Sequence, residues 1–66
     1  MKICDFTQSE ADYLQIVCGF TKDENTLFEL RRQEKSLEDC AEIMNLSVPT
    51  AKRISQRVND KIRREI

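Results

Sequence analysis

The sequence contains no histidine and no tryptophan, and it has only one glycine and one proline among its 66 residues. Without histidine the commonest general base and metal ligand is missing, and a single glycine cannot supply a glycine-rich phosphate loop. No nucleophile lies at a plausible spacing from a base, and so small a domain leaves little room for a water-excluded pocket. We therefore expect that the chain is not an enzyme and that it uses no cofactor.

Long apolar runs are also missing. No stretch approaches the roughly 18 apolar residues that are needed to cross a bilayer. The first residues, MKICDF, have no apolar core of the kind found in a signal peptide. These features predict a cytoplasmic protein without a membrane partner.

Cysteine is present but sparse, at positions 4, 18 and 40. These spacings match no zinc site, and three thiols leave one over from any disulfide. We interpret Cys4, Cys18 and Cys40 as small buried hydrophobic residues, and we expect no bound metal.

The residues that are abundant favour helix. Charged residues make up 35% of the chain and aromatic residues only 6%, and Glu, Lys, Arg, Leu and Ile are plentiful. No segment alternates between apolar and polar residues over a useful length, so no strand is expected. The composition predicts one all-α domain over residues 1–66 with a thin hydrophobic core.

Two segments begin alike, with FTQSE from Phe6 and FTKDE from Phe20. In each, a threonine is followed three residues later by a glutamate, which is the capping-box pattern of a helix start. After an N-terminal tail over residues 1–6, residues 7–35 are therefore predicted to form two supporting helices. They should span residues 8–18 and 22–33, with Gly19 as the break between them and with Phe6 and Phe20 packed just upstream of each helix.

A second pair of helices is predicted over residues 36–66. Ser36 is the expected N-cap of a short helix over about residues 37–45. Asn45 tolerates the left-handed conformation that ends a helix, and Ser47 is the expected N-cap of a final helix over about residues 48–64. Two helices joined by so tight a turn form a compact four-helix domain that contains a helix-turn-helix.

Charge is distributed unevenly along the chain. Residues 1–46 hold ten acidic and five basic side chains, whereas residues 47–66 hold two acidic and six basic ones. In the final helix Ala51, Ile54, Val58 and Ile62 form an apolar stripe, and the opposite side is polar and basic. A basic helix of this kind suits the DNA major groove. The charge and spacing of this helix predict Lys52, Arg53, Gln56 and Arg57 as DNA-binding residues, and the resemblance described next adds Ser47, Val48, Pro49 and Thr50 to the DNA-binding set.

The segment LEDCAEIMNLSVPTAKRISQRVNDKI resembles the helix-turn-helix of region 4 in bacterial sigma factors and of the LuxR-type regulators. The matching positions are the Ala41-Glu42-Ile43 run, Ser47 and Thr50 at the turn, and the closing Lys61-Ile62 pair. The glycine that is usual before the scaffold helix corresponds to Lys35 or Ser36.

This resemblance implies a transcriptional regulator that binds double-stranded DNA. Its recognition helix would enter the major groove, with Val48, Pro49, Lys52 and Arg53 at the start that faces DNA. We expect a free-standing bacterial, prophage or mobile-element regulator, because the chain lacks the separate sigma domain that opens promoters.

Other interpretations stay open. Glu34, Glu38, Asp39 and Glu42 form an acidic cluster that could instead make the chain an adaptor on RNA polymerase. A homodimer could form through Ile62 and Ile66 or through the first helix, while a purely structural coiled-coil dimer ranks last because the apolar stripe is short. We expect Tyr13 and Phe28 to serve packing and not binding.

Overall fold

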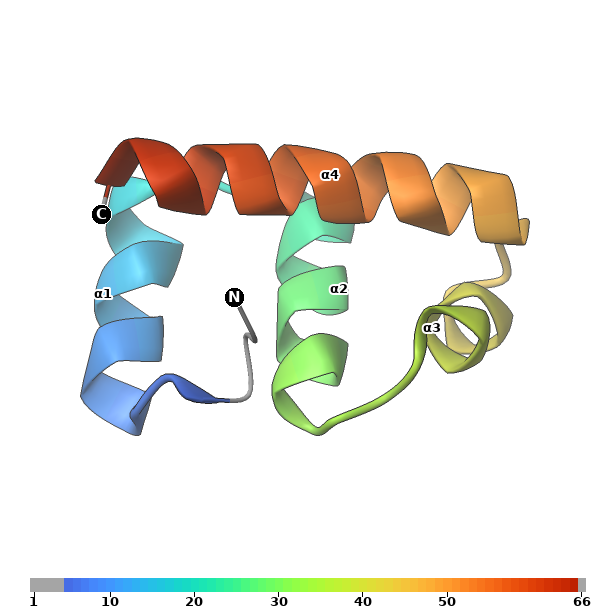
Figure 1. The fold of residues 1–66 in the computed structure, drawn as a ribbon, viewed down its shortest axis with the longest axis horizontal. Helices are drawn as coiled ribbons and strands as arrows, with labels where there is room; N and C mark the ends of the chain where they lie inside the picture. Colours follow the sequence, from blue (N-terminus) through green and yellow to red (C-terminus); the bar gives the residue numbers. More distant parts are fainter. Residues whose placement is uncertain (1–4, 66) are drawn as a thin grey trace.

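The computed structural model describes residues 5–65, and it consists of four helices. They are α1 (Gln8–Val17), α2 (Lys22–Arg32), α3 (Leu37–Ile43) and α4 (Val48–Glu65). No strand occurs within the described range, so the predicted all-α, four-helix fold is confirmed. The longest helix, α4, runs along the whole molecule, and α1, α2 and α3 all lie on one side of it (Figure 1).

The predicted helix starts are confirmed by their hydrogen bonds. The Thr7 hydroxyl accepts from the Glu10 amide at 3.2 Å, and the Glu10 carboxylate accepts from the Thr7 amide at 2.9 Å. Thr21 and Glu24 repeat this reciprocal capping box at the start of α2. Ser36 caps α3 by accepting from the Asp39 amide at 3.1 Å. Each start is therefore fixed by side chains within four residues of it.

The helix ends differ by one or two residues from the prediction. The first three helices end earlier than expected, at Val17, Arg32 and Ile43, while α4 continues to Glu65. A residue with positive φ cannot continue a right-handed helix, and such residues follow the first three helices: Gly19 (φ 61°), Glu34 (φ 63°) and Asn45 (φ 59°).

The left-handed residue after α2 was not predicted. It is Glu34, and not Lys35 or Ser36, which the resemblance aligned with a glycine. The Lys35 amide donates to the Leu30 carbonyl at 3.2 Å, and the Arg31 guanidinium donates to the Lys35 carbonyl at 2.8 Å. These two hydrogen bonds satisfy backbone groups at the end of α2. They hold Glu34 in the left-handed conformation, which a residue with a side chain disfavours.

The hydrophobic core lies between α4 and the three shorter helices. Its fully buried large side chains are Phe28, Leu27, Ile62, Val58 and Cys40. The predicted stripe of α4 is confirmed, since Ala51, Ile54, Val58 and Ile62 are all buried. Phe6 and Phe20 pack against this core, with the ring centroid of Phe20 lying 5.2 Å from that of Phe28.

One expectation about an apolar residue, the role of Ile62 in a dimer, needs correction. Ile62 is 0% exposed, so it belongs to the core and cannot join two copies, while Ile66 lies outside the described residues. Phe28 is fully buried in the core, as expected for a packing residue, and Tyr13 is 57% exposed on α1. Within residues 5–65, no helix has both the length and the apolar character that crossing a bilayer requires.

The described cysteines are free thiols. Cys40 is buried in the core and Cys18 is half-buried, as expected for small hydrophobic residues, whereas Cys4 lies outside the described residues. Burial raises the pKa of the Cys18 and Cys40 thiols, and the carboxylate of Glu65 raises that of Cys18 further. No group of three or more potential metal ligands occurs in the described part of the chain.

Candidate nucleic-acid interface

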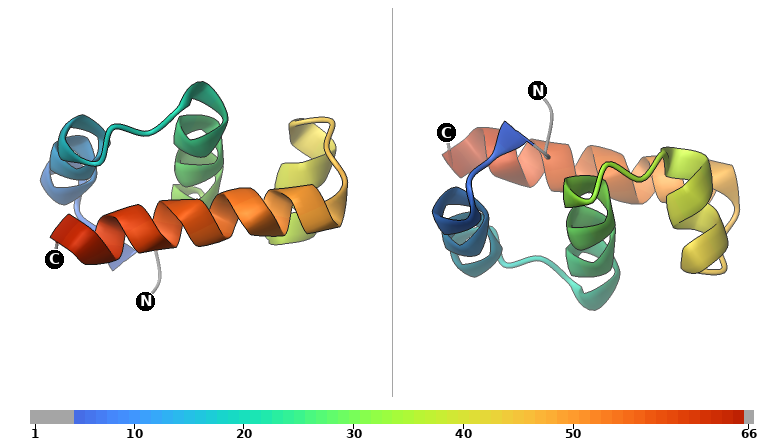
Figure 2. Two further views of the ribbon diagram at one scale, coloured as in Figure 1. Left: turned by 90° about the horizontal axis from the view of Figure 1, so that it is seen from above. Right: turned by 90° about the horizontal axis from the view of Figure 1, so that it is seen from below.

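The turn between α3 and α4 is short and is closed by backbone and side-chain hydrogen bonds. The Leu46 amide donates to the Ala41 carbonyl at 2.8 Å, which closes α3 around the left-handed Asn45. The Ser47 hydroxyl accepts weakly from the Thr50 amide at 3.4 Å and lies 2.8 Å from the Thr50 hydroxyl. The backbone therefore leaves one helix and enters the next within four residues, as Figure 2 shows.

One side of α4 is left open by this arrangement. Because α1, α2 and α3 all pack on the apolar stripe, the opposite side of α4 is covered by no other helix (Figures 1 and 2). Lys52, Arg53, Gln56 and Arg57 recur at helical spacing on this side, are all exposed and together line one shallow hollow of the surface.

The residues before this group vary in exposure. Ser47 and Pro49 are exposed, whereas Val48 and Thr50 are half-buried. The hydroxyls of Ser47 and Thr50 are engaged with each other and with the helix start. The structure thus brings the four residues of the hollow together on one exposed face and sets part of the first turn against the protein.

The first twelve residues of α4 carry positive charge that no acidic residue of the same segment offsets. Between Val48 and Asn59 the helix carries three cations, Lys52, Arg53 and Arg57, and no acidic residue. Within residues 5–65, none of the three forms an ion pair. In the last six residues of α4, by contrast, Arg63 lies 3.7 Å from Asp60. We call Lys52, Arg53, Gln56 and Arg57 the basic face.

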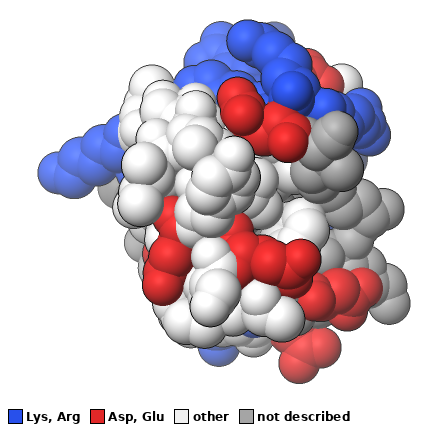
Figure 3. Space-filling model, turned by 90° about the vertical axis from the view of Figure 1, so that its left-hand side faces the viewer, with Lys and Arg blue, Asp and Glu red and all other residues white. Residues whose placement is uncertain are grey.

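Basic and acidic side chains also occupy different parts of the molecular surface as a whole. Figure 3 views the molecule from the end at which α4 finishes, and it shows Lys and Arg gathered mainly along the edge formed by α4. Most of the Asp and Glu side chains in that view lie below this edge. The acidic cluster of Glu34, Glu38, Asp39 and Glu42 is also exposed, and it lies at the end of α2 and on α3.

Lys61 does not belong to the open side of α4, because its side chain is paired with a residue of α2. Its ammonium group lies 2.5 Å from a carboxylate oxygen of Glu24, on α2, and 3.4 Å from the Gly19 carbonyl. Glu24 is only 4% exposed. This ion pair fastens the second half of α4 to the start of α2.

The environment of Glu24 favours its charged form. Burial alone would raise the pKa of the Glu24 carboxyl, but the hydrogen bonds from Lys61 and Thr21 outweigh it and leave the pKa below its ordinary value. A signal for this pair exists in the sequence, because Lys61 lies seven residues after the buried Ile54 and Glu24 lies three before the buried Leu27. Both charged side chains therefore lie on the buried sides of their helices.

Comparison of the chain with protein-family models, with curated proteins and with solved structures found no match. The geometry and charge of the described residues are therefore the features that bear on function.

Proposed function

We propose that this protein is a DNA-binding transcriptional regulator module that places the first ten residues of α4, Val48–Arg57, in the major groove of duplex DNA. The observation that carries the proposal is the basic face: Lys52, Arg53, Gln56 and Arg57 lie together, exposed, on a side of α4 that no other helix covers. A helix with its side chains is about 10–12 Å wide and the major groove about 12 Å, so an uncovered helix fits the groove.

The residue types of the basic face suit both parts of DNA recognition. Arginine and lysine bind guanine edges and phosphates, while glutamine can make a paired contact with adenine. Gln56 lies between the cations on the same face, so we assign it a base edge and assign Arg57 a phosphate. Ser47, which is exposed at the start of α4, contributes a hydroxyl that can reach the DNA backbone.

Duplex DNA suits this surface better than single-stranded nucleic acid does. Proteins that bind single strands combine positive charge with aromatic side chains on which the bases stack. Here Phe28 is buried, Phe6 and Phe20 pack against the core, and Tyr13 lies on α1. No aromatic residue occurs in α4 beside the basic face.

The proposal is tested by titrating a labelled mixed-sequence duplex with the protein at several salt concentrations. If Lys52, Arg53 and Arg57 each displace a phosphate counterion, the logarithm of the binding constant falls with the logarithm of salt concentration with a slope of about −3. The double substitution Lys52→Ala with Arg53→Ala should lower affinity by about 100-fold or more and bring the slope to about −1.

The matched control is Arg63→Ala with Arg64→Ala. It removes the same charge from the same helix but outside the basic face, so affinity should fall by no more than about tenfold. Circular dichroism should show unchanged helicity for both variants, because all four side chains are exposed. Unchanged binding by the Lys52 and Arg53 variant would refute the proposal.

A second candidate is an adaptor that docks on RNA polymerase through the acidic cluster. Within the described residues the four carboxylates of this cluster form no ion pair, so they are available to a basic partner. An adaptor would show no salt-dependent affinity for duplex DNA. Glu38→Lys with Glu42→Lys would abolish its capture by polymerase, whereas a DNA-binding module would keep its duplex affinity with the same change.

A further inference from the structure

The open side of α4 carries one apolar side chain among its polar and basic ones. It belongs to Pro49, which is exposed in the first turn of the helix. The other apolar residues of α4 are turned toward the protein, with Val48 half-buried and with Ala51, Ile54, Val58 and Ile62 buried. The structure describes every residue of α4, and Pro49 is the only exposed apolar one among them.

Pro49 lies on the same face of the helix as two residues of the basic face. At about 3.6 residues per turn it is rotated by about 200° from the buried Ala51, so its ring points away from the core. Arg53 follows it by four residues and Gln56 by seven, which are spacings that place side chains on one face. Pro49, Arg53 and Gln56 therefore form a row about 10 Å long, which corresponds to about three base-pair steps of about 3.4 Å each.

The start of α4 does not depend on the ring of Pro49. The Ser47 hydroxyl lies 2.8 Å from the Thr50 hydroxyl and accepts weakly from the Thr50 amide at 3.4 Å, so side chains on either side of Pro49 fix the first turn. Proline is tolerated there because an amide in a first turn has no partner within the helix. The exposed ring is therefore free to contact a ligand.

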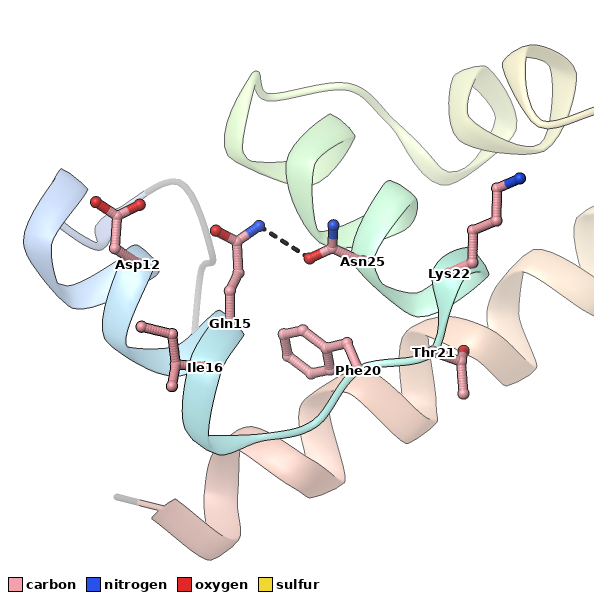
Figure 4. A pocket seen from close by; sticks show the side chains of 7 residues that line it. All are labelled: Asp12, Gln15, Ile16, Phe20, Thr21, Lys22 and Asn25. Carbon is pink, nitrogen blue, oxygen red and sulfur yellow. Dashed lines mark hydrogen bonds between the residues drawn. The ribbon is translucent and has the colours of Figure 1, made fainter.

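Among the described residues, the most exposed large apolar side chain lies on another surface. Ile16, which is 79% exposed on α1, lines a hollow between α1 and α2 together with Phe20 (Figure 4). In the same hollow the Gln15 amide group donates to Asn25 Oδ1 at 2.9 Å, and within residues 5–65 no residue of α4 lines it. This hollow is separate from the open side of α4, where Pro49 is the apolar side chain that the helix presents.

The major groove offers one group that matches an apolar ring. Its base edges carry hydrogen-bond donors and acceptors, and the apolar group among them is the C5 methyl of thymine. Contact between a proline ring and this methyl group removes apolar surface of both from water, which is favourable. A row that begins with Pro49 and continues with Arg53 and Gln56 thus complements base pairs that have a thymine at one end.

We infer that the ring of Pro49 packs on the C5 methyl of a thymine at one end of the contacted base pairs and gives the protein a preference for that base. The inference rests on the proposed function, since it requires α4 to lie in the major groove. Burial of one methyl group should raise the affinity about fourfold. The salt dependence should stay the same, because neither group is charged.

The test starts from duplexes that the protein itself recovers from a random pool. They should share a thymine at one end of the recovered motif. Deoxyuridine at this position removes only the methyl group, so the affinity of the original chain should fall about fourfold. Deoxyuridine in place of a thymine outside the motif should leave the affinity unchanged. This comparison uses the original chain, so it does not depend on the folding of any variant.

The contact is assigned to Pro49 by the variant Pro49→Ser. The position is exposed, so circular dichroism should show unchanged helicity. Pro49→Ser should bind the thymine and deoxyuridine duplexes equally, with the affinity that the original chain has for the deoxyuridine duplex. The control is Gln56→Ala, which should lower the affinity for both duplexes alike and keep their ratio at about four.

Three results would overturn the inference: recovered duplexes that share no thymine, equal binding of thymine and deoxyuridine by the original chain, or a ratio that persists in Pro49→Ser and so reflects duplex shape. The proposed function stands in each case as long as the salt slope stays at about −3. If no duplex shows salt-dependent binding, the proposed function fails and this inference fails with it.

Discussion

Replacing Lys61 by methionine should destabilise the fold without affecting the open side of α4. The change keeps the aliphatic stem but removes the cation that pairs with Glu24. Breaking a fully buried ion pair by removing one partner costs about 3–5 kcal/mol. Here the Lys61 side chain is 24% exposed and Glu24 keeps its hydrogen bond from the Thr21 amide. We therefore expect a loss of about 2 kcal/mol in the free energy of unfolding.

A loss of this size is large for so short a chain. The total free energy of unfolding should lie at about 3–10 kcal/mol, and Tm should fall by about 8–16 °C. Urea unfolding followed by circular dichroism at neutral pH measures the loss directly. Arg64→Met, which removes an exposed cation from the same helix, is the matched control and should change stability by less than about 0.5 kcal/mol.

The pH dependence of the same variant provides an independent check. Because the folded pKa of Glu24 lies below its ordinary value of 4.5, the stabilisation is complete above pH 4.5 and is lost as pH falls through that lower folded value. The difference between the original chain and Lys61→Met should therefore shrink on acidification below pH 4.5. If Lys61→Met unfolds within about 0.5 kcal/mol of the original chain at neutral pH, the pair is solvated and the reasoning fails.

Three further predictions follow from single positions. Glu34→Gly should raise stability by about 0.5–1 kcal/mol, seen as a higher Tm, because glycine adopts the left-handed conformation without strain; a lower Tm would contradict this. Ile62→Ala should cost about 2–5 kcal/mol in urea unfolding, because its side chain is fully buried, and a loss below about 1 kcal/mol would place it at the surface instead. Peptide-resolved alkylation at pH 8 should modify Cys18 before Cys40, since Cys40 is 0% exposed; equal rates would show that the core opens freely.

The helix starts and the core of this fold could be predicted from the sequence because both depend on short-range patterns. A capping box such as that of Thr7 and Glu10 lies within one helical turn, so its hydrogen bonds follow from residue type and spacing. The stripe from Ala51 to Ile62 likewise follows from the period of the helix. The exposure of Lys52, Arg53 and Gln56 was predictable for the same reason, since they lie opposite that stripe.

What escaped prediction depends on contacts that residue type and helical spacing do not specify. Lys61 and Glu24 are 37 positions apart, and only the packing of α4 on α2 brings their charges together. The left-handed Glu34 depends on bonds from Arg31 and Lys35 that hold the connection in place of a glycine. The exposure of Ile16 is set by which helices cover which side of α1, and a helical period alone does not specify that.

The formal net charge of −1 does not argue against binding to DNA, because the charges that a duplex meets are those of the nearest face. Two of the six cations of α4 are paired, Lys61 with Glu24 and Arg63 with Asp60, so they add little to the field outside. The acidic residues below α4 are separated from its open side by the thickness of the molecule, whose shorter extents are 19 and 18 Å. This thickness exceeds the electrostatic screening length, which is about 8 Å at physiological salt. Charge on the far side is therefore largely screened, and the basic face sets the sign of the potential at the open side of α4. At low salt this screening weakens, so the acidic residues repel the DNA phosphates more strongly. The affinity for DNA should therefore rise less steeply as salt is lowered than three phosphate contacts alone would give.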